Sequence, residues 1–374
     1  MKCLLFDLLT GEDLDQLSVV DATWTQTIGS PDSVKFDVPV YTESMRRLGL
    51  ANLVTPKKTV IAVQEDGWAD FVAAGRVGIP EWDEDTKVLS IPGNGVESVL
   101  GDRLVLPFNV GNIIGPDGKP VSTYDTNLKG WEYGTIIKKL VQQAMGMPGF
   151  GLPWVFEPDR VGSREKNTEA ADMKNLLELI DDITKLEGGV EVDYVSRWRT
   201  DVVGKMQTLL RTATDADRLI TSQSEFDFSI RGKNPTARKL KFKLLPTYMT
   251  SRAWFTGGKS DDRMLVARAD DSYLVDRGFP FSEVLDSSHS SVKEQSTLDS
   301  YARARVAQGR TIGKFYSFDV RKSAAVGMRK GDWLSLDIRG SVFLENGQKR
   351  LRVVSMSGGT SDPEWLQVVT AEEF

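Results

Sequence analysis

The stretch Val34-Lys35-Phe36-Asp37-Val38-Pro39-Val40 alternates apolar and polar residues, and Lys239-Leu240-Lys241-Phe242-Lys243-Leu244 repeats the pattern with lysine at each polar position. A period of two places successive side chains on opposite faces of a sheet, as in half-buried antiparallel strands. Two further runs carry apolar residues at alternate positions: Phe226, Phe228, Ile230 and Leu334, Leu336, Ile338. The chain is therefore predicted to be mainly β.

Composition limits the classes of function that are open to the chain. Its 374 residues suggest two or three domains, and a hydrophobic content of 40% is enough to build cores. The net charge of -6 argues against nucleic acid as the main partner, because phosphate binding needs a basic patch. Cys3 and His289 are the single cysteine and the single histidine, which excludes an intrachain disulfide and a Cys/His zinc site. Neither a metal nor a cofactor is predicted.

The ends and apolar segments of the chain give no sign of a membrane or export signal. Residues 1–15 lack the basic region and the long apolar core of a signal peptide. No segment reaches the roughly 20 apolar residues that a membrane span requires. We therefore expect a soluble chain that is made in a cytoplasm and has no membrane anchor.

Residues 1–104 are predicted to form a small β-barrel or sandwich. The expected strands lie near residues 4–7, 18–26, 33–40, 59–64, 68–80 and 87–92, with turns at 29–32, 65–67 and 81–86. A short helix over residues 42–50, capped at Thr42, is expected to plug one barrel end. Another short helix, after Gly95, is expected to carry Val96, Val99 and Leu100 toward the core.

Residues 105–200 are predicted to be a loop-rich and helical insertion. Residues 104–124 are rich in Pro, Gly and Asn, and apolar residues at helical spacing then predict helices over 132–145 and 173–186. Residues 201–374 are predicted to be mainly β, with one helix that Ser296 or Thr297 caps and Gly309 ends. The predicted fold class is α+β and mainly β, with two small antiparallel β-barrel-like domains and a mixed α/β insertion between them.

Three motifs suggest chemistry, and each has a simpler interpretation. Residues 253–260 fit a loose phosphate-loop pattern, but Trp254 and Phe255 would crowd such a loop, so a polar hairpin loop is predicted instead. His289 lies in a serine-rich stretch, residues 287–291, without a Gly-x-Ser-x-Gly motif, which favours a linker over a catalytic triad. No catalytic residue is predicted.

The third motif consists of acidic residues between two predicted strands: Glu81, Asp83, Glu84 and Asp85. They lack the spacing of a calcium loop, and a charged run of this kind usually faces water in a turn. Asp270-Asp271 has the same interpretation. A hydrolase built on such carboxylates stays open, because the distance between two carboxyl groups is not visible in a sequence.

Nine tryptophans occur in the chain, mostly at predicted strand positions or turn edges. Core packing is the default interpretation for such residues. Large amphipathic rings are also favoured at protein interfaces. The candidate interface residues are Trp68, Trp82, Trp333 and Trp365.

The order of elements and of Gly-Asp turns resembles siphophage minor tail proteins of the tail-hub type, the baseplate-hub or tail-associated proteins found in actinobacteriophages. The resemblance begins in residues 22–39, 74–79, 89–93 and 101–103, and continues in residues 298–308, 314–320, 331–336 and 352–353. It covers nearly the whole chain. Some members of the family continue into a long extension, whereas this chain stops at Phe374.

The resemblance implies a structural protein without enzymatic activity at the tip of a phage tail. In that family a homotrimer brings six barrels into a ring, which connects the tail tube and distal tail protein to the tip and lets the tape measure protein and DNA pass. Other tip proteins would then bind the receptor and cleave the cell wall. The alternative is a β-rich protein that binds or hydrolyses glycans at the host surface, through exposed tryptophans or the acidic residues above.

Overall fold

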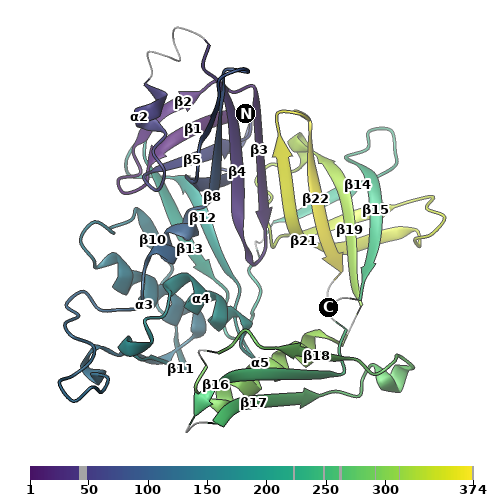
Figure 1. Ribbon diagram of the computed structural model, residues 1–374. Coiled ribbons are helices and arrows are strands. Elements are labelled where there is room, and N and C mark those ends of the chain that lie inside the picture. The colour runs from purple at the N-terminus through teal and green to yellow at the C-terminus, as the bar shows by residue number, and fades with distance from the viewer. Residues whose placement is uncertain are drawn as a thin grey trace.

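The computed structural model describes residues 1–41, 49–221, 224–246, 249–260, 263–290, 292–310 and 312–372 (Figure 1). A large sheet dominates it, and two smaller helical parts lie below that sheet in the view of Figure 1. The predicted helix over residues 42–50 falls largely outside the described residues, which resume before α2 (Leu50–Leu53). None of the helices in these ranges is long and apolar enough to cross a bilayer.

The N-terminal strands form one half of the large sheet, in the order β3-β4-β8-β6-β5-β1-β2, and β7 pairs with β8. Their bounds are β1 Lys2–Asp7, β2 Asp13–Leu17, β3 Asp21–Thr27, β4 Ser30–Pro39, β5 Thr59–Gln64, β6 Ala73–Val77, β7 Glu81–Asp83 and β8 Val88–Gly95. The alternating stretch that predicted a strand is β4, in which Val34, Phe36 and Val38 are buried. Two predictions were wrong: β2 was missed, and β7 occupies part of the predicted turn at 81–86.

The C-terminal strands form the other half, in the order β15-β19-β22-β21, with β20 between β21 and β14. Their bounds are β14 Glu225–Ser229, β15 Ala237–Leu245, β19 Gly313–Arg321, β20 Trp333–Ile338, β21 Gly347–Gly359 and β22 Trp365–Glu372. Among the described strands β2, β7, β14 and β15 each pair with a single other strand, so closure into two barrels stays a prediction.

The two halves join where β21 pairs with β3 in an antiparallel register. Thr27 and Ser355, which are 328 positions apart in the sequence, lie side by side at this join with their hydroxyl groups 2.9 Å apart. Gly358 lies opposite Trp24, and a Cβ atom at Gly358 would come within 2.9 Å of the Trp24 ring. The glycine therefore allows the indole to cover the join.

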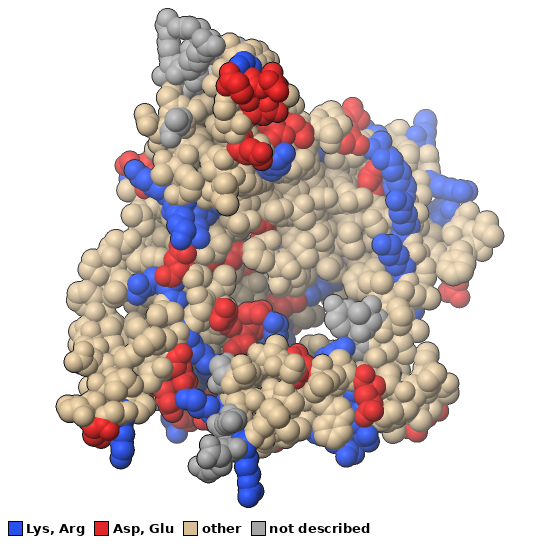
Figure 2. Space-filling view, in the orientation of Figure 1, with Lys and Arg blue, Asp and Glu red and all other residues tan. Residues whose placement is uncertain are grey.

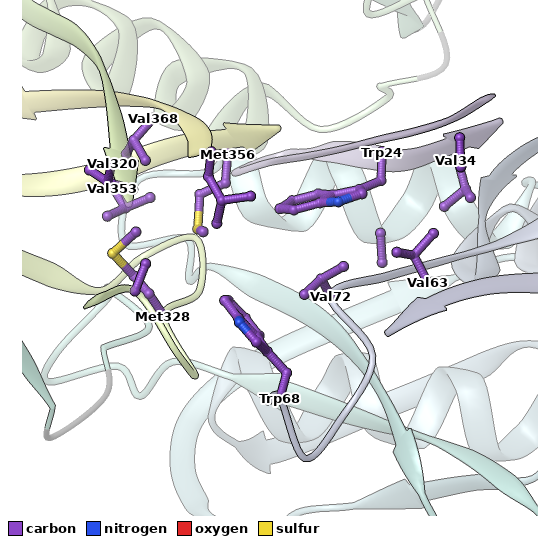
Figure 3. Packing of buried hydrophobic residues seen from close by; sticks show 14 of the residues in the cluster. Trp24, Val34, Val63, Trp68, Val72, Val320, Met328, Val353, Met356 and Val368 are labelled. Carbon is purple, nitrogen blue, oxygen red and sulfur yellow. The ribbon is translucent and has the colours of Figure 1, made fainter. Parts of the chain in front are cut away.

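One hydrophobic core runs continuously beneath both halves of the sheet. Figure 3 shows Trp24 and Val34 on one side of it and Val320, Val353 and Val368 on the other, with Met356 beside Trp24. These residues are at most 2% exposed. Because they share a core, the two halves are packed as one body, as a continuous apolar cluster requires.

The first insertion lies between β8 and β14 and has its own core, which also packs against β1, β5 and β6. Its elements are β9 Thr126–Trp131, α3 Tyr133–Met145, β10 Trp154–Phe156, β11 Val161–Thr168, α4 Leu176–Lys185, β12 Val192–Trp198 and β13 Met206–Thr212. Both predicted helices are present. Helix α4 begins later than predicted because the Asn175 side chain caps it, accepting hydrogen bonds from the N–H groups of Leu177 and Glu178.

The second insertion lies between β15 and β19 and comprises β16 Arg252–Ser260, β17 Arg263–Asp270, β18 Glu283–Asp286 and α5 Gln295–Gln308. The loose phosphate-loop motif forms β16 and is followed by β17, another strand, so the predicted hairpin loop was wrong. Helix α5 begins after Glu294, without a side-chain cap, so the predicted cap at Ser296 or Thr297 was also wrong, whereas Gly309 ends it as expected.

Short 3-10 segments connect several of these elements. They are η1 Val96–Asp102, η2 Ser122–Tyr124, η3 Ala170–Asp172, η4 Val275–Arg277 and η5 Lys322–Ala324. Segment η1 confirms the predicted short helix after Gly95, and its Val96, Val99 and Leu100 are buried. The long stretch from 104 to 124 is mostly irregular, as its composition predicted.

Candidate functional site at a buried charged junction

Three buried cations from the C-terminal half of the sheet reach acidic residues of the N-terminal half and the first insertion. Lys322 lies in η5, Lys330 precedes β20, and Arg352 lies on β21. Their side chains are only 10% to 12% exposed. Because buried charges are costly unless they are paired, this arrangement fixes which surfaces of the three parts can meet. We call these contacts the charged junction.

Lys330 is the centre of the junction because it touches both other parts. Its Nζ atom lies 2.7 Å from Oδ1 of Asp32 on β4 and 3.3 Å from Oδ1 of Asp193 on β12. Both carboxylates are themselves less than 10% exposed. A polar cavity of about 10 Å³, lined in part by Gln26 and Ser196, adjoins them, which is space for about one water molecule.

Lys322 connects the two halves of the sheet. Its Nζ atom lies 2.9 Å from both carboxylate oxygens of Glu65, whose side chain is 2% exposed. The indole N–H of Trp24 donates to the same carboxylate over 3.0 Å. Glu65 therefore has a hydrogen-bond donor from each half of the sheet, as a buried carboxylate requires.

Arg352 ties β21 to the first insertion. Its two terminal nitrogens lie 2.7 Å and 2.5 Å from the two carboxylate oxygens of Glu191, a bidentate pair. Arg352 also donates to the carbonyl groups of Ile220 and Gly331, at 3.0 Å and 3.2 Å. The planar guanidinium thus holds the end of the insertion against the start of β20.

The junction contains more carboxyl groups than its cations can balance. Burial, and then the charge of Asp32, raises the pKa of Glu97 to about 8, and burial raises the pKa of Asp32 to about 6. Burial disfavours the charged form of Lys330, but Asp32 and Asp193 outweigh it and raise the pKa of this ammonium group. Near neutral pH Glu97 therefore retains its proton and Lys330 stays charged.

Because the folded state holds this proton, we expect the folded state to become less stable at alkaline pH, where Glu97 loses it. The pKa of Glu97 is about 8 in the folded state, against 4.5 for an ordinary glutamate, so the folded protein binds the proton more tightly and loses stability as pH rises toward 8. The loss between pH 6.5 and pH 9 should be on the order of 1–3 kcal/mol. Glu97→Gln, which imitates the protonated group, should remove most of it.

Denaturant unfolding at the two pH values measures this loss. Glu81→Gln, at an exposed position on β7, is the matched control and should keep the wild-type pH dependence. A Glu97→Gln variant with an unchanged loss of stability would contradict the prediction.

The structure does not bring the four candidate interface tryptophans together. Trp68 and Trp333 are 7% and 8% exposed, so packing within the chain accounts for both. Trp82 on β7 is 44% exposed, and its N–H donates to Glu84 over 2.8 Å. Trp365 lies beneath the guanidinium groups of Arg238 and Arg321. An interface role for these tryptophans stays a proposal. Trp82 is the candidate whose ring is accessible.

Four acidic residues of the sequence motifs, Asp83, Glu84, Asp270 and Asp271, have local partners. Asp83 accepts from the N–H groups of Asp85 and Thr86, and Glu84 pairs with Lys87, so the pKa of each carboxyl is lowered. Asp270 pairs with Arg252 and Arg268, and Asp271 with Arg310. No group of three or more potential metal ligands occurs among the residues that the structure describes.

His289 is a packing residue. Its ring stacks on Tyr301 of α5, with ring centres 4.3 Å apart, and lies 5.3 Å from the Phe255 ring. Its Nε2 atom is 3.5 Å from Asp286. The prediction of a serine-rich linker is correct for the backbone of residues 287–290, which has no regular structure, but wrong for the His289 side chain, which is buried.

Sequence reasoning missed the charged junction completely. The partners of each cation lie more than 130 positions away along the chain, as the separations of 257, 298 and 161 residues show for Lys322–Glu65, Lys330–Asp32 and Arg352–Glu191. The available signal was weak: Lys322, Arg329 and Lys330 flank an apolar stretch just before a predicted strand. Such charges usually face water.

Solved phage tail proteins have the same fold. The 43 kDa tail protein of prophage MuSo2 from Shewanella oneidensis is 13% identical, with a TM-score of 0.56, and the match covers 100% of this chain and 98% of that chain. The tail protein from Neisseria meningitidis MC58 is 11% identical, with a TM-score of 0.54, and 100% and 97% are covered. No protein-family model and no curated protein matches the sequence. The resemblance seen in the sequence is thus confirmed at the level of the fold.

Proposed function

We propose that this protein is a structural component of a phage tail tip, a hub that connects the tail tube to the tip. The observation that carries the proposal is the full-length likeness to tail proteins, which includes both halves of the sheet and both insertions. A fold alone does not define a function. The pairing of the buried charged residues also supports a structural role.

The charged junction suits a building block rather than a catalyst. Lys322, Lys330 and Arg352 hold the two sheet halves and the first insertion in one relative orientation, and the continuous core beneath the sheet also joins the two halves. A subunit of a ring needs such rigidity, because small changes of angle between its parts add up around the ring. The carboxylates that a glycan hydrolase would use are instead held by arginines, lysines and backbone N–H groups.

The finer features of the proposal follow from the family resemblance. Three copies would assemble into a ring in which six β units surround a channel, with the distal tail protein above and receptor-binding proteins below. The tape measure protein and DNA would pass through the channel during infection. A net charge of -6 fits this passage, because a surface without a basic excess does not retain DNA.

Two measurements test the proposed function. Light scattering of the purified chain should give about three times its mass of 41.5 kDa, alone or after addition of a distal tail protein. Antibodies against the chain should label intact phage particles at the end of the tail distal to the capsid, with antibodies against a capsid protein as the control. Label on the capsid, or none on the particle, would overturn the proposal.

A further inference from the structure

The second insertion has a hydrophobic core of its own. The core side chains come mainly from β16, β17 and α5, and they include Phe255, Leu298 and Val306. Among the residues that the structure describes, Leu186 is the one member of this cluster from outside residues 251–309. A part of the chain with a separate core keeps its shape when it moves relative to its neighbours.

Two chain segments connect the second insertion to the large sheet, and they lie side by side. They start from Leu245 at the end of β15 and from Gly313 at the beginning of β19, which face each other in the register of the sheet. They meet again where the N–H of Thr250 donates to the carbonyl of Gly309 over 3.3 Å. Two adjacent connections can act as a hinge, because a few loop residues can absorb the rotation of a whole unit.

Away from these connections, the second insertion lies against the first insertion. The two are neighbours at the bottom of the view in Figure 1, with the large sheet above them. Figure 2 shows the molecular surface hollowed between the second insertion and the sheet, with acidic and basic side chains gathered along the hollow. The contact with the first insertion therefore decides how firmly the second insertion is held.

Two groups of ion pairs join the insertions, and we call them the latch. Lys293, just before α5, lies 2.6 Å from Asp172 and 3.5 Å from Glu169. Arg303 on α5 lies 2.7 Å from Glu187. These side chains are 21% to 54% exposed. Ion pairs this accessible to water each contribute little to stability and are weakened by salt.

Hydrogen bonds and one apolar side chain complete the described contact. The hydroxyl of Ser300 accepts from the N–H of Glu187 over 2.8 Å, and the hydroxyl of Tyr301 donates to the carbonyl of Asp182 over 3.2 Å. Leu186 supplies the apolar part. A contact surface of this polar kind between two parts of one chain usually permits relative motion.

We infer that the second insertion is a hinged unit, which turns about the Thr250–Gly309 connection and which the latch docks on the first insertion. The docked form is the one described above. In the released form the second insertion keeps its own core and changes its position relative to the first insertion. The charged junction behaves differently, because its cations are only 10% to 12% exposed and hold the other parts together. The inference does not rest on the proposed tail role.

Double electron–electron resonance between two spin labels on the full chain measures the docking. The labels are placed at Gln142→Cys on α3 and Met264→Cys on β17, both exposed, whereas the native Cys3 is buried. We expect one distance in low salt and a second, different distance in 1 M NaCl, since exposed charges are screened beyond about 3 Å at 1 M. Excess unlabelled chain keeps the measured distances within one copy. Labels at Gln142→Cys and Val203→Cys, both in the first insertion, should give one distance in both salts.

Charge reversal tests the latch directly. Asp172→Arg/Glu187→Arg places like charges opposite Lys293 and Arg303, and should raise the fraction of molecules at the second distance about tenfold in low salt. Addition of Lys293→Glu/Arg303→Glu makes the charges complementary again and should return most molecules to the first distance. This rescue would assign the effect to the ion pairs and not to a change in folding.

The matched control is Asp117→Arg/Asp201→Arg, which makes the same charge change at exposed positions of the first insertion and should leave the wild-type distance unchanged. Thermal melts confirm that each variant is folded. A distance that stays the same after reversal and in 1 M NaCl would overturn the hinge, and a reversal that the added changes fail to rescue would overturn the latch. None of these outcomes affects the tail role, which antibody labelling tests separately.

Discussion

Replacement of Lys330 by methionine is expected to lower the free energy of unfolding by about 3–5 kcal/mol. The substitution removes the cation from between Asp32 and Asp193, both buried, and leaves two carboxylates close together without a counter-charge. Methionine keeps much of the length of the lysine side chain, so lost packing contributes little. Denaturant unfolding at pH 7 measures the loss, followed by tryptophan fluorescence.

The matched control for Lys330 is Lys241→Met, which removes an exposed lysine of β15 and should change stability by less than about 0.5 kcal/mol. A rescue variant separates the charge effect from packing. Asp32→Asn/Asp193→Asn in the Lys330→Met background makes the site neutral and should recover part of the loss, because a neutral site no longer buries an unbalanced charge. A Lys330→Met protein as stable as the wild type would show that the charged junction does not hold the parts together.

Replacement of Trp24 by alanine is expected to cost about 3–5 kcal/mol. The indole is 1% exposed at the join of the two sheet halves, and its removal opens a cavity beside Met356 and Gly358 (Figure 3). It also removes the N–H that donates to Glu65, so among the described residues this carboxylate keeps Lys322 as its side-chain partner. Thermal and denaturant unfolding both measure the effect.

Trp24→Phe is the control that separates the two causes of the expected loss of stability, the cavity and the lost hydrogen bond. Phenylalanine retains most of the apolar ring but has no N–H donor, so a loss of about 1–2 kcal/mol is expected, close to the cost of an unmade buried hydrogen bond. Equal losses for alanine and phenylalanine would assign the whole effect to the hydrogen bond. A negligible loss for Trp24→Ala would show that the join does not depend on this residue.

The sequence predicted the strands of the large sheet better than their connections. Period-two alternation identified β4, β15 and β20 because each has one buried and one exposed face, and helical spacing identified α3 and α4. Strand β2 escaped notice because it carries Asp13, Asp15 and Gln16 and buries only Leu17, so it has no clear apolar face. Strand β16 escaped because its glycines resembled a loop, whereas they permit close packing against the carbonyl groups of Ser290 and Val292.

The charged junction lay beyond prediction for a different reason. A single sequence records which residues are charged but not which of them the fold will bury together. Glu65 and Lys322 look like ordinary surface residues until β3 and β21 pair and close the core above them. The fold was nevertheless accessible, because the order of elements along the chain resembled tail-hub proteins, and solved phage tail proteins share this fold.

The pairing of β3 with β21 has a consequence for the nascent chain. Synthesis proceeds from the N-terminus, so β3 is complete long before the ribosome reaches residue 359, the end of β21. During that interval one edge of β3 is unpaired and Trp24 lacks its cover, which makes the incomplete chain prone to aggregate. Contacts between residues so distant in sequence also form slowly. Premature termination before β21 should therefore yield insoluble fragments, and a chaperone that shields the β3 edge would raise the yield of the folded chain.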